Sequence, residues 1–345
     1  MSAPVRINKA RAYFEFIAAV VYFFVVRSFA RHVAVGIQND VWAPLVEQFL
    51  LAVLLLLGYS AFGSLFDHQP KSIAAQGFPL RAGWPREAAL GMLAGWGAVV
   101  LSVLPMVLIG GIAIVVSTQG SSWGWLIADA AYFALFALAE EVTYRGYGFQ
   151  RLAAVVGSTG ATFGFALFYA ITQALLPGST NASIAFSVVF TFLLSTAYLR
   201  TRALWVSWGL NFAWKASQAL IFGLTVSGIS SHSPIIEGNP MGPFWLTGGG
   251  FGLNASWVAC LVLLLTFPML YRITRDLDYR YNAPEFVPAG IPVDLESAGR
   301  RQHEAATASP VEPAPSSLVQ ILPASAPPAP SRPASDSAAR TDESR

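Results

Sequence analysis

Apolar residues fill most of the chain up to about residue 282, in long runs separated by short polar breaks. Eight of these runs are long enough to cross a hydrocarbon core of roughly 30 Å as helices. We expect these helices at 13–34, 42–66, 88–116, 123–145, 159–177, 183–199, 203–223 and 252–271. The pattern therefore predicts an all-α protein in which residues 13–282 form a polytopic bundle of about eight transmembrane helices.

The pattern changes after the last apolar run. Residues 283–345 are rich in proline, alanine and serine, as in PVEPAPSS and LPASAPPAPSRPASDSAAR. This segment lacks the apolar periodicity needed to bury a core, so it predicts a disordered cytoplasmic tail.

The amino-terminal end resembles a secretory signal, because basic residues precede the first apolar run. That run is interrupted by Arg27 and Arg31 and is not followed by a small-residue cleavage site. We therefore interpret it as a retained transmembrane helix, preceded by a cytoplasmic segment over residues 1–12.

Lysine and arginine gather at alternate ends of the predicted helices. The loops near 117–122, 178–182 and 224–251 contain neither residue. Because an excess of Lys and Arg marks the cytoplasmic side, these loops are predicted to be external and both termini cytoplasmic. Arg27 and Arg31, at the outer end of the first helix, are the exceptions to this pattern.

Composition supports the membrane assignment and excludes one class of partner. Hydrophobic residues make up 54% of the chain and charged residues only 12%, whereas soluble domains are about 25% charged. We expect a multi-pass protein of the cell membrane, with the lipid bilayer as its surroundings. A net charge of +2 without a basic stripe argues against nucleic acid as a partner.

Two adjacent glutamates and an arginine lie in the fourth apolar run, within ALAEEVTYRGYGFQRL. Glu141 and Arg145 are four residues apart, so they share a helix face and are expected to pair. Glu140 is rotated from Glu141 by about 100° and points elsewhere, as a general base beside a structural ion pair would. The plainer alternative is that all three only end the helix at the cytoplasmic surface. Charges inside a bilayer are costly, which favours a functional role.

Three further polar residues belong to the predicted helices. Tyr144, one turn after Glu140, is expected to hydrogen-bond to it, and Asp129 is expected to serve helix packing rather than chemistry. Counted from residue 203, Lys215 lies about 18 Å into its helix at 1.5 Å per residue. This is too deep for its ammonium to reach the surface easily, so it needs Glu140 or Glu141 as a counter-ion.

The segment EEVTYRG, followed by YGFQRL, resembles the first motif of the CPBP family of intramembrane proteases. This family includes the type II CAAX prenyl endopeptidases and bacteriocin-processing or immunity relatives. Its motifs are Glu-Glu-x-x-x-Arg, then Phe-x-x-x-His and His-x-x-x-Asn on two later helices. Here Phe165 and Tyr169 (FALFY) occupy the second motif, and Asn211 and Lys215 (NFAWK) the third. The resemblance extends over roughly 75–272.

The resemblance places the candidate catalytic site at Glu140, Glu141, Arg145, Tyr169, Asn211 and Lys215. The first motif is intact. In the other two, Tyr169 and Asn211 replace the family's histidines, and Lys215 replaces its asparagine.

In the family, the first glutamate is thought to activate a water with help from the second-motif histidine. The third-motif residues are assigned to oxyanion stabilisation or, in another view, to a metal. Zinc prefers imidazole, thiolate or carboxylate ligands, and phenol or amide groups bind it poorly. We therefore expect no metal and no other cofactor in this chain.

The substitutions bear directly on catalysis. The Lys215 ammonium would hold Glu140 in an ion pair and make it a weaker base, and Tyr169 cannot accept a proton as histidine does. Loss of a positioned acid or base commonly slows a reaction by a factor of about 10² to 10⁴. We expect an impaired endopeptidase or a pseudoenzyme, whose polar side chains meet in one cavity facing the cytoplasm.

Three other readings stay open. The chain could be an active glutamate-dependent endopeptidase with Asn211 and Lys215 as oxyanion donors. It could be a non-catalytic scaffold that binds a membrane-embedded or lipidated peptide, or a small transporter that uses the buried charges as a relay. For single residues, Tyr169 could be a packed aromatic and Asn211 an interhelical hydrogen-bonding residue.

Overall fold

The computed structural model describes residues 8–67, 73–116, 122–232 and 236–282. The predicted tail, 283–345, and most of the predicted amino-terminal segment lie outside the described residues. The first helix begins at Lys9, earlier than the predicted position 13, because the Asn8 side chain caps it by accepting from the backbone N–H groups of Ala10 and Arg11.

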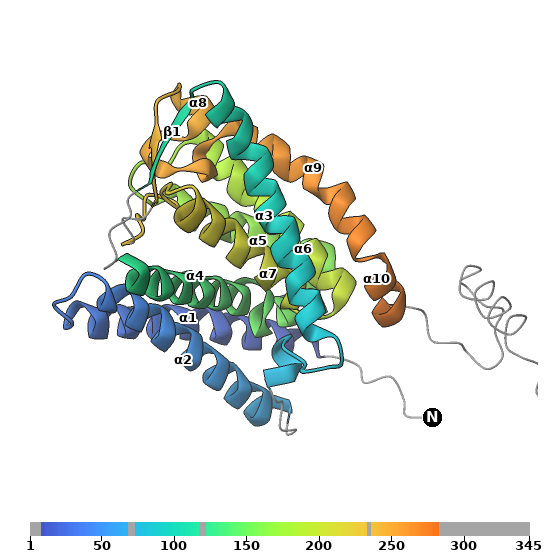
Figure 1. The fold of residues 1–345 in the computed structure, drawn as a ribbon. Coiled ribbons are helices and arrows are strands. Elements are labelled where there is room, and N and C mark those ends of the chain that lie inside the picture. Colours follow the sequence, from blue (N-terminus) through green and yellow to red (C-terminus); the bar gives the residue numbers. More distant parts are fainter. Residues whose placement is uncertain (1–7, 68–72, 117–121, 233–235, 283–345) are drawn as a thin grey trace, which may run out of the picture. The chain divides into compact units, whose positions relative to one another are not determined.

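The described residues are mostly helical (Figure 1). The long helices are α1 (Lys9–Val35), α2 (Trp42–Asp67), α3 (Trp84–Leu108), α4 (Ser122–Arg145), α5 (Tyr147–Ala174), α6 (Asn181–Thr201) and α9 (Trp257–Ile273). The shorter ones are α7 (Trp205–Ala216), α8 (Phe244–Thr247) and α10 (Arg275–Asn282). Helix α4 packs against α2, α5 and α7, so it lies at the centre of the elements that form the site.

Five helices in the described part of the chain are long and apolar enough to cross a membrane, or six if the pair α9 and α10, bent by 60°, forms one span. The predicted number of about eight spans is not confirmed. Helix α7 has only 12 residues before a π-helical turn over Ser217–Ile221. Helices α4 and α5 count together as one apolar stretch, Trp123–Ala174, although α5 is kinked at Gly157.

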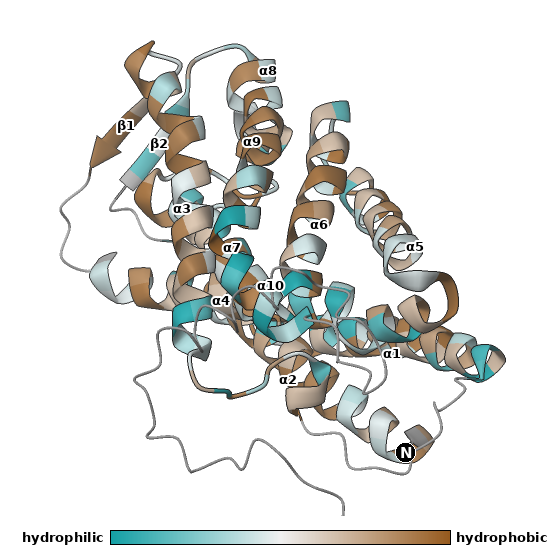
Figure 2. Cartoon of the chain, turned by 90° about the vertical axis from the view of Figure 1, so that its right-hand side faces the viewer, coloured by the Kyte–Doolittle hydropathy of each residue, from teal (hydrophilic) through white to brown (hydrophobic). Residues whose placement is uncertain are grey.

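Hydrophobic residues predominate along most of the long helices (Figure 2), and some of them lie on the outside. Phe24, Leu101, Leu167 and Leu265, from four different helices, are each more than half exposed. An exposed apolar surface of this kind is suited to lipid. The fold is therefore that of a multi-pass membrane protein.

The predicted helix over 88–116 is wrong at its carboxyl end. Helix α3 ends at Leu108, and the residues Ile112–Val116 form a strand, β1, that pairs antiparallel with β2 (Ile236–Pro240). The segment IAIVV is rich in β-branched residues, which favour strands, and Gly110 adopts a positive φ of 74° just before it. An apolar run alone does not distinguish a strand from the end of a helix.

Helices α3 and α7 approach each other closely through glycines. A Cβ atom at Gly91, Gly95 or Gly209 would lie 2.1, 2.4 or 2.2 Å from a backbone oxygen of the facing helix. The sequence GMLAG on α3 thus acts as a small-residue interface of the kind common in membranes. This contact fixes the position of α7, which carries Asn211 and Lys215.

Candidate functional site

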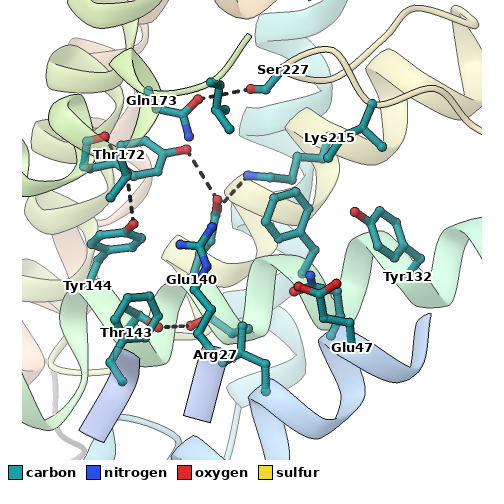
Figure 3. Close-up of a pocket in the computed structure, with 18 residues that line it drawn as sticks. Arg27, Glu47, Tyr132, Glu140, Thr143, Tyr144, Thr172, Gln173, Lys215 and Ser227 are labelled. Atoms are coloured by element: carbon teal, nitrogen blue, oxygen red, sulfur yellow. Dashed lines mark hydrogen bonds and ion pairs between the residues drawn. The ribbon is translucent and has the colours of Figure 1, made fainter. Parts of the chain in front are cut away.

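A cavity of about 260 Å³ extends along α4 (Figure 3). Its lining comes from α1, α2, α4, α5, α7 and the loop after the π-helical turn. Helix α4 contributes the residues from Tyr132 to Tyr144 that face this space, including Glu140.

The Glu140 carboxylate joins three helices. Its Oε2 accepts from the Lys215 ammonium at 2.7 Å and from the Asn211 amide at 3.0 Å. Its Oε1 accepts from the Tyr169 hydroxyl at 3.4 Å. The structure therefore brings Glu140 together with the polar residues of both degenerate motifs, and it confirms the predicted pairing of Lys215 with a glutamate of α4.

Glu141 and Arg145 form a separate pair. The Arg145 Nη1 donates to Glu141 Oε1 at 3.0 Å, and the two side chains are 3% and 0% exposed. The same oxygen accepts from Asn211 Nδ2 at 2.9 Å. The predicted division is confirmed: one glutamate pairs within its own helix, and its neighbour faces the cavity.

Lys215 is enclosed by polar and aromatic groups. Its side chain is 3% exposed, and its ammonium donates to Glu140 and to the Asn211 carbonyl oxygen. It also lies 5.0 Å from the centre of the Phe136 ring and 5.7 Å from that of Phe190. Aromatic faces and a carboxylate together stabilise a cation that is almost fully buried.

The number of N–H donors on Asn211 and Lys215 limits what these two side chains can do. The Asn211 amide has two N–H groups, and both are used, one on each glutamate. Asn211 in this arrangement therefore has no donor left for an oxyanion. The Lys215 ammonium has three N–H groups, of which two are used, so one donor is left.

The contacts of Glu140 leave one of its oxygens available. Its Oε2 accepts from a cation and from a neutral amide. Its Oε1, with a single long contact to Tyr169, is the oxygen with capacity to accept from a further group. The site can therefore hold a polar group beside Glu140.

Two predicted contacts are arranged differently. The Tyr144 hydroxyl meets Thr172 Oγ1 at 3.3 Å rather than Glu140, because the Tyr169 ring packs edge-on against the Tyr144 ring with 4.9 Å between centres. Asp129 accepts from the His232 backbone N–H at 2.8 Å and lies 3.0 Å from His232 Nδ1. It therefore holds a loop, whereas the sequence predicted a role in helix packing.

The cavity extends from Glu140 towards one end of the bundle. It runs towards Glu47, Ser227 and Ile229. The charge pattern predicts that these residues lie near the external ends of the helices. The prediction of cytoplasmic termini and the prediction of a cavity facing the cytoplasm therefore do not fit together.

Several functional candidates were missed from the sequence. Arg27, Glu47, Thr172 and Gln173 all line the cavity. Of these, Arg27 could have been noticed in the sequence, because it is an exception to the predicted distribution of Lys and Arg between the two sides of the membrane.

A second buried carboxylate was also missed. Glu15 of α1 is 1% exposed and faces Arg11 at 2.8 Å, Arg151 at 3.1 Å and the Tyr147 hydroxyl at 3.1 Å. This cluster ties α1 to α5 away from the cavity lining.

Within the described ranges, no three His, Cys, Asp or Glu side chains converge in the way that a metal site needs. The residues around Glu140 offer a lysine, an amide and a phenol instead. This donor set does not fit zinc.

The family model of the Rce1-like type II CAAX prenyl endopeptidases matches residues 96–217. No curated protein and no solved structure gives a significant match to the chain. The matched stretch includes all three motif positions, from Glu140 to Lys215. The resemblance found in the motifs is thereby confirmed over residues 96–217, where the chain is similar to the Rce1-like type II CAAX prenyl endopeptidases.

Proposed function

We propose that the protein is a multi-pass membrane protein that binds a membrane-embedded or lipidated peptide in the cavity beside Glu140, and that its hydrolytic activity is impaired. The family match supports a scaffold built for peptides. The main support for impaired hydrolysis is the contact of 2.7 Å between Lys215 Nζ and Glu140 Oε2.

The physical argument concerns one proton. Hydrolysis by a glutamate requires the carboxylate to take a proton from water while the hydroxide attacks the peptide carbonyl. In this chain the carboxylate that would take this proton is already paired with an ammonium through its Oε2. The phenol hydroxyl of Tyr169 cannot replace a histidine as the second proton acceptor. Both features lower the rate without closing the cavity.

A residual activity is the second candidate, and one observation favours it. Glu140 Oε1 has a single hydrogen bond, of 3.4 Å, and the glutamate lines the cavity. A water bound there would lie near the remaining Lys215 donor, which is able to stabilise an oxyanion. In this candidate Lys215 assists catalysis, and Asn211 acts only by positioning Lys215 and the glutamates.

An assay on purified protein separates the two. Wild type and Glu140→Ala are incubated with prenylated and signal-like peptides, and products are followed by mass spectrometry. We expect binding of peptide by both and cleavage at the level of the uncatalysed control by both. Cleavage by wild type that Glu140→Ala abolishes would overturn the impairment and establish the active candidate. If neither protein binds any of the peptides, the proposed peptide-binding function is contradicted.

The orientation is part of the proposal. The charge pattern favours cytoplasmic termini, and it then places the cavity mouth near the loop 225–232 on the external side. Labelling of a cysteine introduced at Ser227 in intact cells tests this, with a cysteine at Arg86 as the control. We expect a membrane-impermeant reagent to label the first and not the second.

A further inference from the structure

The backbone groups of Ile114 in β1 point away from the sheet. β1 pairs with β2 in an antiparallel register that places Ile114 opposite Gly238. The Gly238 N–H donates to the Gly223 carbonyl at 2.9 Å, so it points away from β1. Two opposite residues of an antiparallel pair either exchange both hydrogen bonds or direct both sets of groups outward. The N–H and C=O of Ile114 are therefore directed to the outer edge of β1.

This outer edge is unpaired within the part of the chain that the structure describes. Because the ladder alternates, Ile112 and Val116 direct their backbone groups to the same edge as Ile114. Figure 2 shows β1 on the outer side of the sheet. β2 differs from β1, since its Gly238 N–H is already bonded to the loop after α7. β1 is thus the strand at which the sheet can be extended.

The side chains at this edge are apolar and exposed. Val115 and Val116 are 54% and 62% exposed, and the surface continues to Leu108 and Ile109 at the end of α3. β1 contains no charged residue and no proline, and these are the residues that commonly prevent an edge strand from pairing with another chain. Both the backbone and the side chains of β1 therefore suit the addition of a further strand.

An identical strand is the partner that these features favour. An antiparallel pair centred on Ile114 matches the outward N–H and C=O groups of each copy with those of the other. The sequence IAIVV has no charge that its own copy would repel, and none that would attract a different chain. Copies inserted in one membrane with the same orientation also hold β1 at the same depth. A symmetric dimer is the commonest closed assembly of identical chains.

We propose that β1 pairs antiparallel with β1 of a second copy, so that two protomers share one continuous sheet. The interface is connected to the candidate site, because Gly223, the acceptor for β2, lies just after the π-helical turn that continues α7, and α7 carries Lys215. The inference does not depend on peptide binding or on catalysis.

Oxidative cross-linking of the full chain in phosphatidylcholine liposomes tests this register. In a pair centred on Ile114, Ala113 of one copy lies opposite Val115 of the other, in a position without hydrogen bonds where side chains are closest. Differently tagged Ala113→Cys and Val115→Cys chains are reconstituted together and oxidised with copper phenanthroline. We expect a mixed disulfide dimer, and much less dimer from either variant alone.

Two controls accompany the cross-linking. Leu175→Cys introduces a thiol at a position of α5 that is 79% exposed, and it should give no dimer above the wild-type level. Wild type itself sets the background, because its only cysteine, Cys260, is buried.

Edge variants test whether the strand holds the dimer together. Ile114→Pro removes an outward N–H but no hydrogen bond to β2, and proline is tolerated at such a position of an edge strand. Val115→Lys adds like charges to the two strands while its side chain stays exposed in the monomer. Each should weaken dimerisation at least about tenfold, a change of roughly 1.4 kcal/mol. Single-molecule photobleaching over a series of protein-to-lipid ratios measures the dissociation constant.

Leu175→Lys, the same charge at the exposed position of α5, should leave dimerisation unchanged. Thermal unfolding of each variant is followed alongside, and a wild-type midpoint for Val115→Lys shows that its weaker association does not come from misfolding.

Four results would overturn the inference. Wild type could stay monomeric at every protein-to-lipid ratio. The mixed disulfide could be no more abundant than the dimer of Leu175→Cys, which would indicate random collisions. A dimer retained by both Ile114→Pro and Val115→Lys would place the interface elsewhere. Cross-linking of Val115→Cys to a different protein in native membranes, with no dimer of the purified chain, would assign this edge to another partner.

Discussion

Lys215 and Glu140 are each other's only charged partner among the residues that the structure describes, with 2.7 Å between Nζ and Oε2. Their side chains are 3% and 11% exposed. Because both charges lie in a largely dry site, each depends on the other for the stability of its charged form.

Removal of the lysine should therefore be costly only while the glutamates are charged. Lys215→Met should lower the free energy of unfolding by about 3 to 5 kcal/mol in wild type. In a Glu140→Gln/Glu141→Gln background the loss should be far smaller. Unfolding in mild detergent measures both, and the double-mutant cycle isolates the coupling. Equal losses in the two backgrounds would show that the charges do not interact.

The impaired activity should respond to restoration of the family's motif residues. The combined variant Tyr169→His/Asn211→His/Lys215→Asn removes the cation from Glu140 and returns two imidazoles to the site. Hydrolysis of a prenylated peptide should rise by a factor of about 10² or more. Product formation is measured by mass spectrometry.

The control for that gain is the same variant with Glu140→Gln, which should be inactive. A folded triple variant without any gain would contradict the view that the replaced motif residues limit hydrolysis. Activity that survives Glu140→Gln would contradict the role of the glutamate.

Helices α3 and α7 are so close that no side chain should fit at their contact. A Cβ atom at Gly95 would lie 2.4 Å from a backbone oxygen of α7, whereas one at Gly97 meets nothing within 4 Å. Gly95→Ala should thus lower the stability by about 1 to 3 kcal/mol through overpacking. Gly97→Ala, the same substitution two residues along, should leave it unchanged or raise it slightly. Equal melting temperatures for the two variants would contradict the close contact.

Much of this fold could be predicted because long apolar runs have few alternatives. The runs indicated the membrane helices, and the spacing of Glu140, Glu141 and Arg145 indicated which glutamate pairs within its helix. The convergence of Tyr169 and Asn211 on Glu140 followed from motifs on successive helices. The first two predictions depend on local geometry, which the sequence expresses directly, whereas the third is what the resemblance to the CPBP motifs implies.

The parts that were wrong or were not predicted depend on tertiary contacts. The strand Ile112–Val116 has β-branched residues that favour a strand, but it is as apolar as a helix end, and its partner, Ile236–Pro240, lies far away in the sequence. The glycine contact of α3 with α7 needs both helices to be known. The direction of the cavity depends on how the helices and the loop 225–232 pack around it, and the depth of a residue in its helix contains no such information.

The contact of Asp129 with His232 should hold that loop in place. Asp129 is 2% exposed and accepts from the His232 backbone N–H at 2.8 Å, while Ser227 and Ile229 of the same loop line the cavity. In Asp129→Ala the loop loses this anchor, so its amides should exchange with solvent at least about tenfold faster, in keeping with the loss of a hydrogen bond to a charged group.

Hydrogen exchange followed by mass spectrometry measures the effect of Asp129→Ala on peptides that cover 225–232. Glu237→Ala is the control, because Glu237 is exposed on β2, nearby in the chain, and should leave the exchange unchanged. Peptides from α3 should keep wild-type protection in both variants. If they lost it in Asp129→Ala, the carboxylate would support the whole bundle rather than the loop. Faster exchange confined to the loop would make Asp129 the residue that controls how far the cavity mouth opens.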